Sequence, residues 1–186
     1  MTGTVVLVRH AMAEADKRHP PDRWELGTEG RGAAAELALH ANLGEVAGIV
    51  SSTEPKALAT AAAFAARTGH AVEPDDRLVE VARPWVGDGY RTAARRYLIG
   101  DEPEGWEPRH VVAERFGAAI DDARARVGEG ELLVISHGLS LSLHLEAVFP
   151  LPFDVYGFWC RLAFPDAWRV DRDELTLTRV ATRESW

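Results

Sequence analysis

The stretch TVVLVRHA, residues 4–11, carries the first signal of the fold. Its apolar part, Val5–Val8, is continuous rather than alternating, as expected for a strand buried on both faces of a parallel sheet. Ile49–Val50 and Leu132–Ile135 have the same character. These three runs predict the central strands of a mostly parallel sheet.

Helix signals lie between and after the predicted strands. They cover residues 29–43, 55–67, 111–127 and 139–148. Pro55 stands at a first helical turn, and Gly44 and Gly69 stand just beyond helix ends, which are the places that favour these residue types. Strand and helix alternating in this order predict a three-layer α/β/α architecture with right-handed crossovers. We expect residues 1–186 to form a single domain.

The C-terminal part departs from this alternation. Residues 158–164, 168–170 and 175–180 are predicted as short strands, with a turn at 171–173 between the last two. The domain is therefore expected to end in a short strand-rich segment.

Residues 83–110 form a second departure from the pattern. The segment is rich in Gly, Pro and charge, yet it carries Trp85, Tyr90, Tyr97 and Trp106. It could be an insertion that covers an active site, or a surface excursion that is simply packed.

Composition excludes several classes of protein. The 186 residues are 46% hydrophobic and 27% charged, with a formal net charge of −8, which disfavours nucleic-acid or anionic-membrane binding through bulk charge. The single cysteine, Cys160, forms no intrachain disulfide. The opening apolar run is too short for a signal peptide or a membrane span. A cytoplasmic protein without membrane or nucleic-acid partners is expected, and the sequence does not indicate its oligomeric state.

Two histidines follow predicted strands directly. Arg9-His10 comes after the first strand, and His137-Gly138 comes after the strand at 132–136. Ligands of open α/β sheets bind at the carboxyl ends of the strands, so both imidazoles would face one cleft. Arg9 offers a guanidinium fork for phosphate or carboxylate, and Gly138 opens a helix whose free N–H groups favour an anion. The other histidines show no spacing typical of metal ligands, and neither metal nor cofactor is expected.

Five blocks in order resemble the histidine phosphatase superfamily, which has the phosphoglycerate-mutase-like fold. They are VVLVRHA at 5–11, like the opening strand and RHG signature; WELGTEGR at 24–31, like LTxxGxxQA; SSTEPKALATA at 51–61, like SSPxxRAxQTA; DRLVE at 76–80, like the LxE block; and VISHG at 134–138, like VxHG. The resemblance runs from residue 4 to about residue 145.

This resemblance implies a role for each matching residue. His10 would be the nucleophile that forms a phosphohistidine, and Arg9, Lys56 and His137 would hold the phosphate. Glu80 would protonate the leaving group and then activate water. A neutral imidazole is a competent nucleophile, and phosphoryl transfer needs mainly positioning and positive charge, so this scheme requires no metal.

The chain also departs from the family pattern. Ala11 stands in place of the glycine of RHG, and Lys56 in place of arginine, which keeps the charge but loses the bidentate fork. Met12, Ala13 and Asp16 depart from the mutase-type continuation, so a phosphoglycerate mutase is not the expected activity.

Three functions stay open at this point. The first is a metal-independent phosphomonoesterase acting on a small phosphorylated metabolite. The second is a phosphohistidine protein phosphatase, which the compact chain and its short RHAxAE loop resemble, although such proteins tend to lack the LxE acid. The third is a catalytically weak sensor of a phosphorylated ligand, which the Arg-to-Lys departure at Lys56 suggests.

Substrate choice must come from residues around this core. Two basic clusters are candidates for a second anionic group of the substrate, unless they are only solvated: Lys17, Arg18, His19 and Arg23, and Arg83, Arg91, Arg95 and Arg96. Glu14 is an alternative acid near His10.

Overall fold

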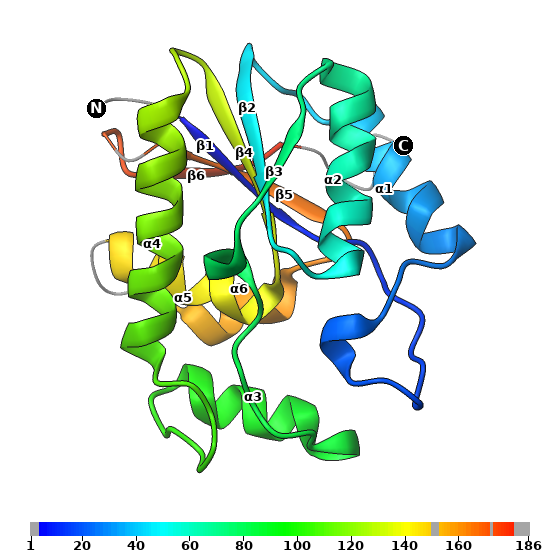
Figure 1. Ribbon diagram of the computed structural model, residues 1–186. Coiled ribbons are helices and arrows are strands. Elements are labelled where there is room, and N and C mark those ends of the chain that lie inside the picture. Colours follow the sequence, from blue (N-terminus) through cyan, green and yellow to red (C-terminus); the bar gives the residue numbers. More distant parts are fainter. Residues whose placement is uncertain (1–3, 150–152, 172, 181–186) are drawn as a thin grey trace.

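The computed structural model describes residues 4–149, 153–171 and 173–180, which form one mixed sheet with helices on both sides (Figure 1). In chain order the strands and α-helices are β1 (Val5–Arg9), α1 (Thr28–His40), β2 (Val46–Ser51), α2 (Pro55–Thr68), β3 (Val72–Pro74), α3 (Tyr90–Leu98), α4 (Arg109–Arg126), β4 (Glu131–Ser136), α5 (Gly138–Val148), α6 (Val155–Arg161), β5 (Asp166–Asp171) and β6 (Thr176–Arg179). No helix in these described ranges is long and apolar enough to span a bilayer.

The sheet has the strand order β3-β2-β4-β1-β5-β6. Strands β3, β2, β4 and β1 are parallel, and β5 is antiparallel to both of its neighbours. This confirms the predicted mostly parallel sheet. In the register, Arg9 lies opposite Ser136 and Ser51 lies opposite Ile135, so the carboxyl ends of β1, β2 and β4 meet at one edge.

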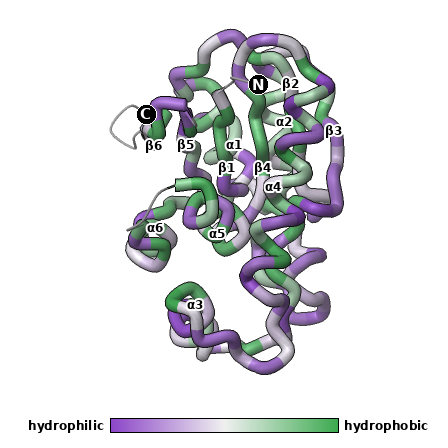
Figure 2. The backbone as a smooth tube through the Cα atoms, turned by 90° about the vertical axis from the view of Figure 1, so that its left-hand side faces the viewer, coloured by the Kyte–Doolittle hydropathy of each residue, from purple (hydrophilic) through white to green (hydrophobic). Residues whose placement is uncertain are grey.

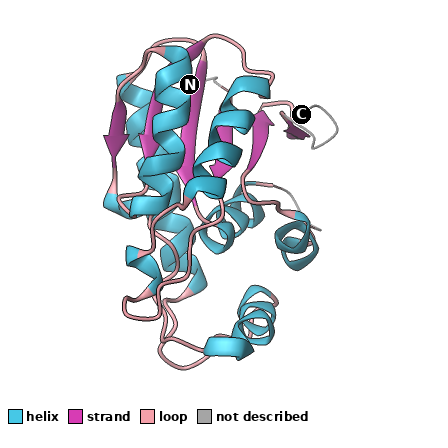
Figure 3. Ribbon diagram, turned by 90° about the vertical axis from the view of Figure 1, so that its right-hand side faces the viewer, coloured by secondary structure: helices cyan, strands magenta, loops and turns pink. Residues whose placement is uncertain are grey.

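The central strands are apolar along their whole length because helices cover both faces of the sheet. Successive side chains of a strand point to opposite faces. Val5 and Leu7 pack in one core cluster with residues of α4 and α5, and Val6 and Val8 pack in another with residues of α1 and α2. Figure 3 shows α1 and α2 in front of the strand layer. The three-layer prediction is confirmed.

The four predicted helices all form, with shifts at their ends. Helix α2 begins at Pro55 as expected, and Gly69 follows it in the left-handed conformation with φ 77°, where a side chain would be strained. Helix α1 ends at His40 rather than beside the predicted stop at Gly44, and Ala41 takes the capping position.

The strand predicted at 158–164 was wrong, because residues 158–161 belong to helix α6 and residues 162–164 lie in the loop that follows it. The Asp154 carboxylate accepts a hydrogen bond of 2.8 Å from the Gly157 N–H and so caps the first turn. Aromatic residues favoured a strand in the sequence, but Phe158 and Trp159 are buried on a helix instead. The strands predicted at 168–170 and 175–180 correspond to β5 and β6, and the turn predicted at 171–173 includes a residue outside the described ranges.

The unusual segment 83–110 contains α3 and is anchored by aromatic residues. Tyr97 and Trp106 are buried with their ring centroids 4.8 Å apart, and the Tyr97 hydroxyl donates a hydrogen bond of 2.7 Å to the Glu107 carbonyl. In Figure 2, α3 lies beyond α5 and α6 on the side away from the strands.

Candidate active site

The sheet edge at the ends of β1, β2 and β4 brings the predicted site residues together. The rings of His10 and His137 meet edge to face with centroids 5.0 Å apart. Lys56 comes from the first turn of α2, and Glu80 comes from the loop that follows β3. Glu54 contacts Lys56, His137 and the Glu80 N–H, and thereby joins these three residues.

His10 is held in one tautomer. Its Nδ1 lies 2.7 Å from the carbonyl oxygen of Ala11. A carbonyl only accepts hydrogen bonds, so Nδ1 carries the proton and Nε2 keeps its lone pair. Burial lowers the pKa of His10 well below its ordinary value, and the charges of His137, Lys56 and Arg9 lower it further. The ring is therefore a neutral imidazole with a free nucleophilic nitrogen.

The substitution of Ala11 for glycine costs the backbone nothing. Leu175 is the one non-glycine residue with positive φ in the described ranges, so Ala11 needs no conformation that alanine avoids. Its N–H donates to the Thr60 hydroxyl at 3.0 Å, which ties the catalytic loop to α2.

His137 is fully buried and faces two oxygen atoms. Its Nε2 lies 2.8 Å from the Ser52 hydroxyl and 3.3 Å from the Glu54 carboxylate, whereas its Nδ1 is buried with no partner in the described residues. Burial lowers the pKa of His137 well below its usual value, and nearby Lys56 and Arg9 add to this effect. Nδ1 is therefore a buried polar atom that no described residue satisfies.

Lys56 is buried, and its ammonium group is held by two acceptors. Nζ donates to the Pro21 carbonyl at 2.7 Å and forms a short ion pair with Glu54. Burial raises the pKa of Glu54, and the charge of Lys56 opposes that rise. The cation in this part of the site is thus already paired with a carboxylate.

Glu80 sits against the amino end of α5. Its carboxylate accepts hydrogen bonds from the N–H groups of Val81, Leu139 and Ser140 and from the Ser140 hydroxyl, at 2.9 to 3.2 Å. A carboxylate at this position is favoured by the helix dipole. These bonds fix the acid next to His137, the residue that precedes α5.

Arg9 is buried and stacked on Phe164, with 3.3 Å between its guanidinium carbon and the ring centroid. One terminal nitrogen donates to the Leu162 carbonyl at 2.9 Å, but Nε is buried without a partner. Burial lowers the pKa of Arg9 to about 10, which leaves it charged at neutral pH.

Any side chain at position 138 would crowd this arginine. A Cβ at position 138 would lie 3.1 Å from Arg9 Nε and 3.1 Å from Trp159 Nε1. The indole N–H of Trp159 is also buried and unpaired. Two unpaired donors therefore lie close to the start of α5. The N–H groups of Leu139 and Ser140 are not free for an anion as predicted, because they already donate to Glu80.

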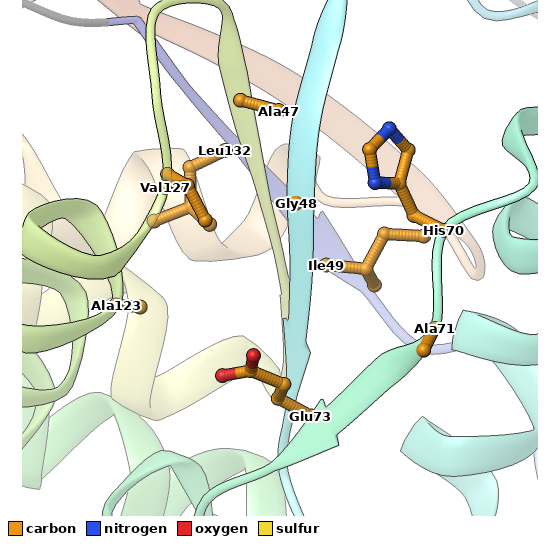
Figure 4. Close-up of a pocket in the computed structure, with 9 residues that line it drawn as sticks. All are labelled: Ala47, Gly48, Ile49, His70, Ala71, Glu73, Ala123, Val127 and Leu132. Carbon is orange, nitrogen blue, oxygen red and sulfur yellow. The ribbon is translucent and has the colours of Figure 1, made fainter.

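A cavity of about 220 Å³ lies away from these residues. Its lining comes from β2, the loop before β3, β3, β4 and the end of α4, and it includes His70 and Glu73, shown in Figure 4. None of the predicted site residues lines this cavity. Across the ranges that the structure describes, no group of three His, Cys, Asp or Glu side chains is placed to hold a metal ion.

Comparison with known proteins identifies the class. A mostly parallel α/β sheet with two histidines and two buried cations at its carboxyl edge is a fold and site suited to binding phosphate. The family model of the histidine phosphatase superfamily (branch 1) matches residues 5–162, and the chain belongs to this family. A comparison with curated protein sequences finds no match.

Solved structures share the fold over nearly the whole chain. A mycobacterial glucosyl-3-phosphoglycerate phosphatase is 22% identical with a TM-score of 0.70, and the match covers 98% of this chain and 100% of that chain. YhfR of Bacillus stearothermophilus is 24% identical with a TM-score of 0.71, covering 99% and 98%. A phosphoserine phosphatase from Entamoeba histolytica is 16% identical with a TM-score of 0.72, covering 96% and 95%.

Sequence reasoning missed several residues that surround the site. Glu54 and Ser52 were only part of a motif block, Phe164 was assigned to a strand, and Trp159 received no role. The sequence signal for Glu54 was a carboxylate two residues before a lysine that replaces an arginine.

Proposed function

We propose that this protein is a phosphatase that hydrolyses a small phosphomonoester through a phosphohistidine on His10. The observation that carries this proposal is the His10 tautomer, because the Ala11 carbonyl fixes the proton on Nδ1 and leaves Nε2 as a nucleophile. Arg9 and Lys56 supply the positive charge that a phosphoryl group needs, and Nδ1 of His137 adds a donor once it is protonated.

The reaction takes place in two balanced steps. In the first, Nε2 of His10 forms a bond to phosphorus while the bond from phosphorus to the ester oxygen breaks, and the leaving oxygen receives a proton from Glu80. In the second, Glu80 takes a proton from water as the water oxygen attacks phosphorus, and the N–P bond breaks to return His10 and phosphate. Neither step needs an electron donor or acceptor.

The segment 83–110 is proposed to cover this site. Tyr90 of α3 packs against Trp159 with ring centroids 6.1 Å apart, and Trp159 reaches the start of α5. Burial raises the pKa of Tyr90 to about 12, with the charge of Glu80 adding to it, so its hydroxyl stays a neutral donor beside the site. Exclusion of water at this position would strengthen the electrostatic contacts to phosphate.

A phospho-ligand sensor is the second candidate. It is favoured by the ion pair of Lys56 with Glu54, which occupies the cation that would otherwise meet the phosphate. A sensor would bind phosphate analogues but would not release phosphate.

The deciding experiment is release of p-nitrophenol from p-nitrophenyl phosphate with excess EDTA, comparing the wild type with His10→Ala. We expect the wild type to turn over with the chelator present and the variant to lose at least about 10³-fold in kcat, since the covalent route is removed. Acid quench of the wild type should trap phosphate on the protein, and His10→Ala should trap none.

Two results would contradict the proposal. Equal turnover by both proteins would exclude His10 as the nucleophile. No turnover by either, together with orthovanadate binding to the wild type, would support the sensor.

A further inference from the structure

Glu54 is a carboxylate among the residues proposed to bind an anion, where a negative charge is not expected. It is buried, with 8% of its surface exposed, and it lies in the loop between β2 and α2. Although it occupies the cap position of α2, its side chain makes no capping hydrogen bond to that helix. The carboxylate turns instead toward the candidate active site.

Its two oxygens contact three residues of the site. One oxygen pairs with the ammonium of Lys56, and the other accepts a hydrogen bond of 2.8 Å from the backbone N–H of Glu80. The second oxygen also lies 3.3 Å from Nε2 of His137. One buried side chain thus joins α2, the loop after β3 and the turn before α5.

The contact of Glu54 with Lys56 gives the ammonium group a fixed orientation, which an arginine at this position would have had from its planar guanidinium. A lysine side chain is flexible and its ammonium has no fixed orientation of its own. With two of its N–H groups held by Glu54 and the Pro21 carbonyl, the third is left for a ligand. The carboxylate of Glu54 also neutralises part of the positive charge that Lys56 would offer to a phosphate.

The contact with His137 determines which nitrogen meets the phosphate. A carboxylate only accepts, so Glu54 favours the proton on Nε2 and leaves Nδ1 as the unpaired atom; the Ser52 hydroxyl can accept from the same Nε2–H. Nδ1 can donate to phosphate only if the ring takes up a second proton.

Other charged groups around His137 oppose that second proton. Arg9, Lys56 and Arg115 all lower its pKa, and His10 lies against its ring. Glu80, at the start of α5, and Glu54 are the nearby carboxylates, but only Glu54 makes an ion-pair contact with the ring.

We propose that Glu54 is a positioning residue that orients Lys56 and holds the proton on Nε2 of His137, so that His137 becomes an imidazolium when a dianionic phosphoryl group binds. This inference deepens the proposed function and rests on the same site. It requires that ligand binding be accompanied by proton uptake, and that this uptake depend on Glu54.

The test measures proton uptake on binding of inorganic sulfate, a dianion that does not itself titrate near neutral pH. Calorimetry at pH 7.5 in two buffers of different ionisation enthalpy gives the number of protons taken up. All proteins carry His10→Ala, so that His10 cannot contribute and turnover plays no part. We expect uptake approaching one proton with Glu54 intact and less than half of that in Glu54→Gln.

The matched control is Glu131→Gln. Glu131 is also buried, at 7% exposure, and it is also ion-paired, with Arg169, but it lies at the start of β4 away from the site. We expect this variant to lose stability yet to keep the full proton uptake.

The variant His137→Asn should abolish proton uptake, because the group that gains the proton is gone.

Turnover gives an independent measure in proteins with His10 present. Glu54→Gln should move the alkaline limb of kcat to lower pH by about 1 unit or more, the size of effect expected from removing an opposite charge. The Glu54→Asp variant keeps a carboxylate, so its alkaline limb of kcat should lie between those of the wild type and Glu54→Gln. Glu131→Gln should leave the pH dependence of kcat unchanged.

The outcomes separate this inference from the proposed function. Unchanged proton uptake in Glu54→Gln would overturn the role of Glu54, whatever the wild type does with substrates. Uptake that survives in His137→Asn but is lost in Glu54→Gln would also overturn it, because Glu54 itself would then carry the proton. Proton uptake that depends on Glu54 in the His10→Ala proteins, together with no turnover by the wild type, would support the role of Glu54 and reject the phosphatase.

Discussion

At the scale of single residues, Glu80 tests whether the site carries out chemistry or only binds. Its carboxylate is fixed at the start of α5, beside His137. A p-nitrophenolate ion departs without a proton, whereas an alkoxide such as that of glycerol phosphate needs one. We therefore expect Glu80→Gln to lower kcat by about 10²-fold or more for the alkyl ester.

With p-nitrophenyl phosphate, the same variant should still form the phosphohistidine and release p-nitrophenol in a rapid burst. The second step, which needs Glu80 as a base, should then become slow. The control is Glu14→Gln, which removes an exposed alternative acid and should change neither substrate. Equal losses on both esters with no burst would show that Glu80 is not the proton donor.

At the scale of elements, the strands that carry the site could be predicted, and the elements that surround it could not. Val5–Val8 and Leu132–Ile135 are continuous apolar runs, which is typical of buried parallel strands. His10 and His137 follow these two strands in the sequence, so their place at the edge of the sheet could be predicted. Helix α6 was misread because aromatic residues favour strands locally, and its capping carboxylate, Asp154, only became decisive in the folded chain. The contacts of Glu54 were not predictable either, because they join residues 26 and 83 positions apart in the sequence.

The segment around α3 leads to a prediction about substrates. Arg83 stacks on Tyr90 and Trp106 at 4.4 and 5.5 Å from the ring centroids, and it has no acidic partner within the described ranges. Its Nε is buried and unpaired. An unneutralised cation held near the site by aromatic rings would favour a substrate with a second anionic group.

We expect Arg83→Met to raise KM by about tenfold for phosphoserine or phosphoglycerate, the effect of losing about 1.4 kcal/mol of binding. KM for p-nitrophenyl phosphate, which has no second anion, should change by less than about twofold. Arg95→Met is the matched control, since Arg95 lies 5.6 Å above the Tyr156 ring on the same segment. If Arg83→Met raised KM equally for all three esters, the arginine would serve the phosphate or the fold rather than a second group.

At the scale of the whole molecule, the proposed phosphate site joins parts of the chain that pack on different faces of the sheet. Lys56 belongs to α2 on one face, Gly138 to α5 on the other, and Arg9 to the strand between them. An anion that contacts all three should stabilise the folded chain as a unit. Orthovanadate or sulfate at 100 times its Kd should add about 2.7 kcal/mol, because it binds only the folded state. For a domain of this size the increase in Tm should be about 5–10 °C.

Arg9→Met should abolish that increase, whatever its own Tm, because the shift is measured within one variant. Arg126→Met provides the control, since Arg126 is an exposed residue of α4 that pairs with Glu73 far along the sheet from the site. Its anion-induced shift should equal that of the wild type. A full shift in Arg9→Met would place the anion elsewhere on the molecule, and the joint role of β1, α2 and α5 in holding phosphate would be rejected.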